Sequence, residues 1–198
     1  ECDMNAEKML PIDLLRKRRS LVAAKIVDPG PTEHELGLII EAGLRVPDHG
    51  RCGPWRVQVI SKKGQLALGK LYGELYKREN SDASGEQIEY WLNRPSSAPC
   101  LLAITCHINQ AKIEKIPASE QHLSVGALCQ NILNASHALG YVAQWLTEWP
   151  SYHDEVKKML GHSAETEISG FIFIGTAAEE PGERKRVSAD EVVSFWDG

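Results

Sequence analysis

Two short apolar runs constrain the fold more than any other feature of this 198-residue sequence. They cover residues 99–108 and 168–175, and apolar side chains follow one another in both with few polar interruptions. A strand with this pattern is typically covered on both faces, whereas a strand with one face in water alternates between apolar and polar residues. We therefore expect two buried strands, the first of them central in its sheet.

The other elements follow from capping signals and from the spacing of apolar residues. Thr32 and Glu35 form a capping box, which predicts a helix that ends before Pro47. Alternating polarity predicts a half-buried strand over residues 55–61. Further expected elements are helices at residues 11–17, 64–80, 88–93, 120–139 and 151–160, a strand at 141–146, a mobile loop at 81–85 and a polar tail at 179–186. No repeat or shift in composition divides the chain, so we expect one domain over residues 1–198.

The charge balance argues against two classes of partner. The chain has 22 basic and 27 acidic residues, a net charge of −5, and no diffuse positive field that would attract nucleic acids or acidic membranes. No apolar run approaches the ~18 residues of a membrane span, and residues 1–10 lack the pattern of a secretory leader. We expect a soluble, cytoplasmic protein with neither nucleic acid nor membrane as a partner.

The cysteines and histidines do not predict a disulfide framework or a metal site. Five cysteines form an odd set without a C-x-x-C pair, which favours reduced thiols. His49 and Cys52 have a metal-like spacing, but Arg51 between them would repel a cation and no second pair stands nearby, so no metal is expected.

A P-loop-like stretch at residues 64–70 suggests a different class of protein, a nucleotide-binding phosphotransferase. It fails at its last position, where Leu71 follows Lys70 in place of the Ser or Thr that would bind Mg²⁺. The leucines of this stretch are better explained as the interior of a helix, although phosphotransfer stays open as an alternative.

The run Arg18-Arg19-Ser20 has the composition of a site for a phosphate group. Guanidinium groups bind phosphate oxygens in pairs, and a serine hydroxyl adds a neutral donor. By itself the run could be a solvated basic turn. A second basic cluster, Arg184-Lys185-Arg186, stands near the other end of this acidic chain, and the two clusters could close on one phosphate.

Several motifs occur in an order and spacing that is more specific than any one of them. They are Arg18-Arg19-Ser20, Arg45-Val46-Pro47-Asp48-His49-Gly50 with Pro54-Trp55-Arg56, the long helix ending at Gly140, Gln144-Trp145-Leu146-Thr147-Glu148-Trp149, the run from Gly170 to Thr176, and Arg184-x-Arg186. Together they resemble the FMN-dependent nitroreductase family, in its compact bacterial subgroup, over nearly the whole chain. The resemblance implies an α+β fold with a central mixed or antiparallel sheet between helices, built as an intertwined homodimer with one FMN in each of two interface pockets.

By similarity, one group of residues surrounds the phosphate end of the flavin. Arg18, Arg19 and Ser20 would hold the phosphate and the ribityl chain. Arg184 and Arg186 would close on the phosphate from the tail.

A second group is expected around the flavin ring. Trp145, Leu146 and Thr147 would lie along the isoalloxazine, with a backbone N–H near Thr147 facing the flavin N5. Arg45 and His49 would reach the flavin from the other subunit, so that neither subunit completes a site alone.

The resemblance implies an NAD(P)H oxidoreductase that reduces nitroaromatics, quinones or related electron-poor acceptors by ping-pong hydride transfer. The flavin carries the chemistry, so no catalytic side chain is expected. Two positions depart from the family pattern: Val22 replaces a basic residue, with Lys25 as a possible substitute, and Glu148 replaces a glycine. An acid beside the flavin would oppose its reduction, which keeps a non-catalytic flavin-binding protein as an alternative.

Overall fold

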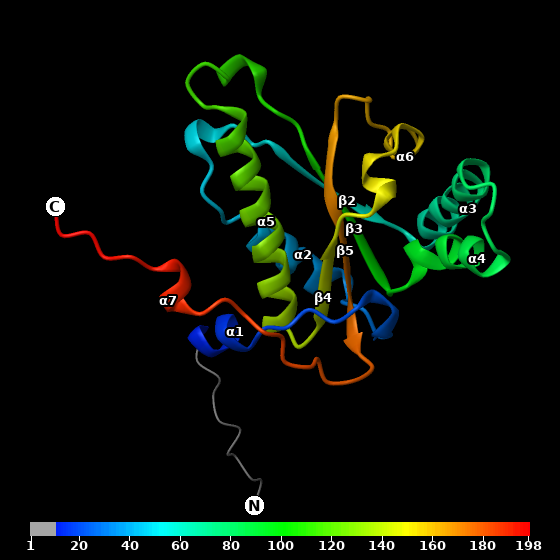
Figure 1. The fold of residues 1–198 in the computed structure, drawn as a ribbon, viewed down its shortest axis with the longest axis horizontal. Coiled ribbons are helices and arrows are strands. Elements are labelled where there is room, and N and C mark those ends of the chain that lie inside the picture. Colours follow the sequence, from blue (N-terminus) through cyan, green and yellow to red (C-terminus); the bar gives the residue numbers. More distant parts are fainter. Residues whose placement is uncertain (1–10) are drawn as a thin grey trace, which may run out of the picture.

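The computed structural model describes residues 11–198, and its core is a five-stranded sheet between two layers of helices (Figure 1). The helices are α1 (Pro11–Lys17), α2 (Glu33–Gly43), α3 (Lys62–Glu79), α4 (Gly85–Asn93), α5 (Ala118–Ala138), α6 (Asp154–Met159) and α7 (Ala189–Val192). The strands are β1 (Ile26–Val27), β2 (Trp55–Ile60), β3 (Cys100–Cys106), β4 (Val142–Leu146) and β5 (Glu167–Ala177). The expected α+β class is confirmed, while the expectations for residues 1–10, and for Cys2 among them, lie outside the described part.

All strand pairs in the described chain are antiparallel, so the mixed sheet that we also considered is not observed. The order is β1-β5-β3-β2, and β4 pairs with β5 beside β1, on the side away from β3. Strand β3 is central, as its apolar run predicted. The two-residue β1 carries no such run and was not expected.

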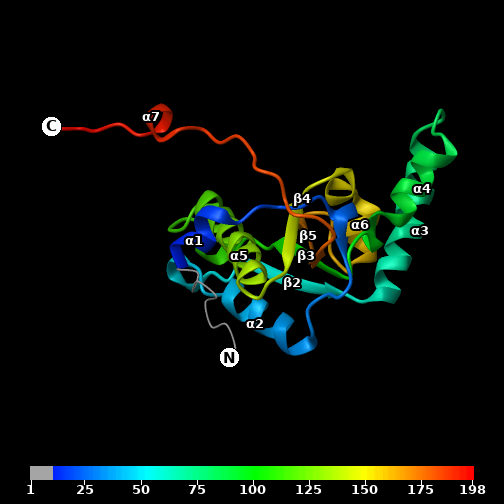
Figure 2. The same cartoon turned by 90° about the horizontal axis from the view of Figure 1, so that it is seen from below.

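The two apolar runs are buried because helices cover both faces of the sheet. Leu102 and Ile104 of β3 face α2 and α5, where they pack with Ile39 and Leu128. Leu101 and Ala103 alternate with these residues along β3 and face the opposite side, toward α3 and α6. Figure 2 shows the two helical layers on either side of the strands. The absence of polar alternation in β3 thus has the predicted cause.

Helix ends follow the local signals in most places. The Thr32 side chain accepts a hydrogen bond from the Glu35 backbone N–H, and the Glu35 carboxylate accepts one from the Thr32 backbone N–H, which confirms the capping box of α2. Gly140 has a φ of +87°, a conformation that glycine adopts without strain, directly after α5.

Helix α3 begins two residues before the expected start, because the Ser61 side chain accepts a hydrogen bond from the Gly64 backbone N–H. The whole P-loop-like stretch therefore lies inside a helix, where its N–H groups bond to the preceding turn. It forms no phosphate-binding loop, which removes the ground for a phosphotransferase.

Two further helices begin three residues away from the expected start, whereas α5 and β5 differ from the prediction by at most two residues at either end. Helix α4 begins at Gly85 instead of residue 88, because Ser84 and Gln87 form a capping box within the segment expected to be a loop. The helix expected at 151–160 is two pieces, the 3₁₀ turn η5 (Trp149–Tyr152) and α6. His153 is extended between them and accepts a hydrogen bond from the Glu155 N–H through Nδ1.

After β5 the chain runs as a polar segment without regular structure, forms α7 and projects away from the body (Figures 1 and 2). Large side chains are exposed on this arm, with Phe195 at 91% and Trp196 at 89%. Within residues 11–198, no helix is both long and apolar enough to cross a bilayer. The four cysteines of this part form no disulfide, and burial raises the pKa of Cys106 to about 11 and of Cys129 to about 12.

Candidate functional site

Arg18 and Arg186, from opposite ends of the chain, lie close enough for their charges to interact, and Ser20 contacts Arg18. Arg18 Nη1 donates to Ser20 Oγ at 3.3 Å. Burial, followed by the charges of Arg186 and Arg19, lowers the pKa of Arg18, so these guanidinium groups are close enough to repel one another. In the described residues, neither Arg18 nor Arg186 forms an ion pair with a carboxylate. The nearby Glu183 carboxylate is paired with Arg19. We call Arg18, Ser20 and Arg186 the anion clamp, because gathered positive charge that no carboxylate pairs with directly favours an anion.

Two other basic residues of this region, Arg19 and Lys25, are bound to acids of the tail. Arg19 forms an ion pair with Glu183. Lys25, the expected substitute for a basic residue at position 22, lies 2.5 Å from Glu179. Val22 is itself half exposed, and the Arg184 side chain is exposed beside the clamp.

The loop after α1 is held in place by α5 and β4. His137, in the last turn of α5, has its Nε2 at 2.7 Å from the Arg19 carbonyl oxygen. The Gln144 side chain on β4 accepts a hydrogen bond from the Ala23 backbone N–H at 2.6 Å. These contacts fix the clamp at the C-terminal end of α5.

Arg45 and His49 belong to the segment between α2 and β2, and they contact α5 at other points along its length. The Arg45 carbonyl accepts a hydrogen bond from Asn131 at 3.2 Å, and His49 Nδ1 lies 2.7 Å from a carboxylate oxygen of Glu120 in the first turn of α5. Glu120 and His137 are about 25 Å apart at the helical rise of 1.5 Å per residue. A single chain therefore holds His49 and the clamp at opposite ends of α5, as Figure 1 shows for residues 49–51 (cyan) and α1.

The three residues at the end of β4 differ in their surroundings. Trp145 is 37% exposed and donates from Nε1 to the Ser169 carbonyl at 2.9 Å. Leu146 packs into the core that α3 and α6 cover, and Thr147 is exposed. In residues 11–198, β4 pairs with β5 alone, so its other edge offers backbone N–H groups to a ligand.

The sequence from residue 16 to residue 176 matches the model of the Nitroreductase family. This chain belongs to the Nitroreductase family. The family resemblance predicted from the motifs is thereby confirmed. Escherichia coli K12 has a relative, named "Putative NAD(P)H nitroreductase YdjA", that is 30% identical over 169 residues, or 83% of this chain and 87% of that protein. A "Putative NAD(P)H nitroreductase" of Haemophilus influenzae Rd is 27% identical over 177 residues, covering 89% and 93% of the two chains.

Solved structures of nitroreductase-like proteins share the fold. A nitroreductase-like family protein from Bacillus cereus superposes with a TM-score of 0.79 at 18% identity, over 96% of this chain and 97% of that chain. The FMN- and NADPH-dependent nitroreductase NfnB of Sphigopyxis sp. strain HMH has a TM-score of 0.74 at 19% identity, over 96% and 100% of the two chains.

In this nitroreductase-family chain, the unusual acid Glu148 is neutralised by a buried arginine. Arg94 Nε lies 2.8 Å from one carboxylate oxygen of Glu148, and Nη2 lies 3.0 Å from the other. The Arg94 side chain is 8% exposed and its guanidinium lies 5.1 Å from the centroid of the Phe173 ring. The two-point contact directs the carboxylate toward the core that α3 covers, and its charge is matched.

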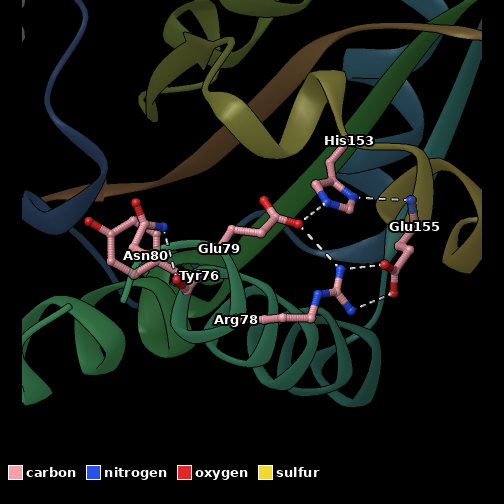
Figure 3. A network of polar contacts seen from close by, with 6 residues as sticks. All are labelled: Tyr76, Arg78, Glu79, Asn80, His153 and Glu155. Carbon is pink, nitrogen blue, oxygen red and sulfur yellow. Dashed lines mark hydrogen bonds and ion pairs between the residues drawn. The ribbon is translucent and has the colours of Figure 1, made fainter. Parts of the chain in front are cut away.

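A second polar network joins α3 to α6 (Figure 3). Glu79 lies 2.9 Å from His153 Nε2, and Arg78 lies 2.5 Å from Glu155. Hydrogen bonds from His153 and Arg78 lower the pKa values of Glu79 and Glu155, respectively. The network fastens the end of α3 to the start of α6, next to an open cavity of about 510 Å³ that Trp149 lines.

Sequence reasoning missed Arg94, Gln144 and Glu183. Each acts through a partner that is distant in sequence: Arg94 and Glu148 are 54 positions apart, and Arg19 and Glu183 are 164 positions apart.

Proposed function

We propose that this nitroreductase-family protein is a single-domain, cytoplasmic, FMN-dependent NAD(P)H oxidoreductase. Its acceptors would be nitroaromatics, quinones or related electron-poor compounds, reduced in a ping-pong reaction. The observation that carries the proposal is the anion clamp, because in the described chain Arg18 and Arg186 lie close together, neither forms an ion pair, and both suit a terminal phosphate. The FMN and NADPH dependence named for NfnB supports this cofactor pair.

The chain's own residues divide into two groups around such a cofactor. Arg18, Ser20 and Arg186 would bind the phosphate, with Arg184 beside them. The outer edge of β4 and the turn after it, at Trp145, Leu146 and Thr147, would lie along the ring, and a backbone N–H near Thr147 would donate to its N5. Bound FMN would supply the hydride chemistry, while the protein supplies position and charge.

The proposal includes a homodimer, for which the length of α5 is the main support. His49 and the clamp are about 25 Å apart along this helix in one chain. Two copies with antiparallel α5 helices would place His49 and Arg45 of one copy beside the clamp of the other. The outer face of α5 suits close contact, with Leu123 73% exposed and Gly126 near it.

The arm after β5 gives the dimer a second support. Val192, Phe195 and Trp196 are exposed on it, and it projects from the body (Figure 2). Exposed apolar side chains of this size are typical of surfaces that a partner covers.

The pairing of Glu148 with Arg94 favours an enzyme over a passive flavin carrier. The carrier alternative rested on an unpaired carboxylate next to the flavin, which would resist the negative charge of the reduced state. With its charge matched, Glu148 no longer supplies that reason.

An absorption spectrum of the purified protein tests the proposal. We expect oxidised-flavin bands that NADPH or NADH bleaches, recovery of FMN after denaturation, and steady NAD(P)H consumption when a nitroaromatic or quinone is added. Recovery of FAD, or no flavin binding after reconstitution with FMN, would contradict it. Bleaching without turnover on any acceptor would support the carrier alternative instead.

A further inference from the structure

Arg19 differs from its neighbour Arg18 in that nearly all its donors are already used. An arginine side chain has five N–H groups. Arg19 donates from Nε and Nη2 to the Glu183 carboxylate, and from Nη1 to the carbonyl oxygens of Arg16 at 2.8 Å and Arg18 at 3.0 Å. One N–H remains for any ligand, whereas Arg18 donates to a single described partner, the hydroxyl of Ser20.

Glu183 connects Arg19 to the tail segment that carries Arg186. Its Oε1 accepts from Arg19 Nε at 3.0 Å and from the backbone N–H of Arg184 at 2.9 Å. The hydrogen bond from Arg19 is the main cause that lowers the pKa of Glu183. The carboxylate therefore fixes the backbone direction just where the chain turns toward the clamp.

A second pair of contacts fastens the same segment four residues earlier. Lys25 Nζ lies 2.5 Å from Glu179, and the Lys25 carbonyl accepts from the Ala178 N–H at 3.0 Å. The tail thus runs antiparallel to the loop after α1, with acids on the tail and bases on the loop. We call residues 178–183 the strap; Figure 1 shows this part of the chain (orange) returning from β5 toward α1.

We infer that Arg19 is a positioning residue and not a phosphate ligand: through Glu183 it holds the strap so that Arg186 stands opposite Arg18, and these two arginines bind the phosphomonoester. This rests on the proposed function, because the phosphate belongs to the proposed cofactor. The charges agree with it. Arg19 and Glu183 form a pair with no net charge, and the clamp itself supplies two guanidinium charges for a phosphomonoester of about −1.5 to −2 near neutral pH.

The strap also explains how two like charges are held together before a ligand arrives. The charge of Arg186 contributes to the lowered pKa of Arg18, so bringing the two together is unfavourable without an anion. Two acid–base contacts hold the strap against that repulsion. Ordering the tail in advance leaves less conformational entropy to lose when the phosphate binds.

A charge exchange tests the inference. FMN and riboflavin, which lacks the phosphate, are titrated by fluorescence quenching into apoprotein of the wild type, Arg19→Glu, Glu183→Arg and the double variant. We expect each single variant to lose tenfold or more in FMN affinity with riboflavin affinity unchanged, and the double variant to regain most of it. If Arg19 binds phosphate directly, Glu183→Arg keeps its affinity and the double variant stays as weak as Arg19→Glu, which would overturn the inference.

Amide hydrogen exchange of residues 178–186 in the apoprotein gives a second readout that needs no flavin. The single variants should exchange faster there, and the double variant should return to the wild-type rate. Equal rates in all four proteins would contradict the inference that Arg19 and Glu183 hold the strap. Glu155→Arg, which breaks a similar surface pair with Arg78, is the matched control and should leave FMN affinity unchanged. A wild type that binds no FMN would refute the proposed function, and the exchange data would then still decide whether Arg19 holds the strap.

Discussion

Arg94 and Glu148 form a two-point ion pair that joins the end of α4 to the end of β4. Arg94 is the more buried member, with its side chain 8% exposed against 29% for Glu148. A buried charge is tolerated only where a partner and hydrogen bonds replace its water. Glu148 is thus the counter-ion of a buried arginine, and the two residues act as one electrostatic unit.

The flavin midpoint potential should respond to the two members of this pair in opposite directions. Glu148→Gln leaves the Arg94 charge unmatched, which favours the reduced, more negative flavin and raises the potential by tens of millivolts. Arg94→Gln leaves the carboxylate unmatched and lowers it. For a two-electron couple, ~30 mV corresponds to 1.4 kcal/mol.

Spectroelectrochemical titration of both variants and of the double variant checks this expectation. The double variant should lie near the wild type, since neither charge remains. A potential that stays constant in all three variants would mean that the pair lies too far from the flavin to act on it. Glu148→Gln should also cost about 3 kcal/mol in the free energy of unfolding, measured with urea, because it strands a buried charge.

The sequence predicted those parts of the fold that depend on local pattern. The unbroken apolar run of β3 required cover on both faces, and the Thr32 capping box marked α2 correctly. Where the predicted start of a helix was wrong, another feature of the same segment determined the structure. Ser84 started α4 inside a polar stretch that composition favoured as a loop, and the extended backbone of His153 interrupted an otherwise helical pattern.

The candidate site was predictable in its charged motifs and not in its pairings. Arg18 and Arg19 are adjacent and chemically identical in the sequence, which gave them the same expected role. Only the folded chain shows that Arg19 faces Glu183 while Arg18 faces Ser20. Such a difference depends on where the tail crosses the loop after α1, and no local pattern carries that information.

Arg18→Ala should weaken FMN binding by about 1.5–3 kcal/mol, the range for a hydrogen bond to a charged group. The fold should be retained, because Arg18 has no ion-pair partner in the described chain to leave unmatched. Fluorescence titration of apoprotein with FMN measures the change, and far-ultraviolet circular dichroism reports the fold. Lys158→Ala, at an exposed position on α6, is the control. Unchanged affinity would remove Arg18 from the site.

Mixing two inactive variants should restore activity if each site needs both subunits. Arg18→Ala damages the clamp, and His49→Ala damages the region at the other end of α5. When the two proteins are refolded together, each heterodimer has one site with only wild-type residues, so NAD(P)H oxidation should recover. The mixture is checked for heterodimer with two affinity tags. Absence of recovery in confirmed heterodimers would place each site within one chain.

The ion pair of His122 with Glu167 should make stability depend on pH in a defined direction. The hydrogen bond with Glu167 raises the pKa of His122 above its ordinary value and outweighs partial burial, which lowers it. A raised pKa in the folded state means that the stabilisation is complete below the unfolded value of about 6.5 and is lost as pH rises through the folded value. The pair is partly exposed, so the effect should be under about 1 kcal/mol.

Unfolding free energies at several pH values for the wild type and His122→Gln measure that contribution. The difference between the two proteins should shrink as pH rises. A difference that grows with pH would contradict the assigned direction.

Gly170→Ala should destabilise the protein and disturb the end of β4. The register of β3 against β5 shifts at this point, since Ile104 pairs with Gly170 and the next residue pairs with Ile168, so Ser169 is the extra residue of a bulge. The bulge lets the Ser169 carbonyl reach Trp145 Nε1. Gly170 has a φ of +139°, and an added Cβ would lie 2.4 Å from Trp145 Nε1 and 2.6 Å from the Leu146 carbonyl oxygen.

Because backbone strain and a steric clash add, we expect Gly170→Ala to cost about 2–4 kcal/mol in the free energy of unfolding. Gly37→Ala is the matched control, since its Cβ would meet nothing within 4 Å in helix α2 and should stabilise the protein by about 0.5–1 kcal/mol. Trp145 and Leu146 are proposed to line the flavin, so FMN affinity should fall in Gly170→Ala and stay constant in Gly37→Ala. If the two variants have the same free energy of unfolding and the same FMN affinity, the bulge has no role in shaping the end of β4.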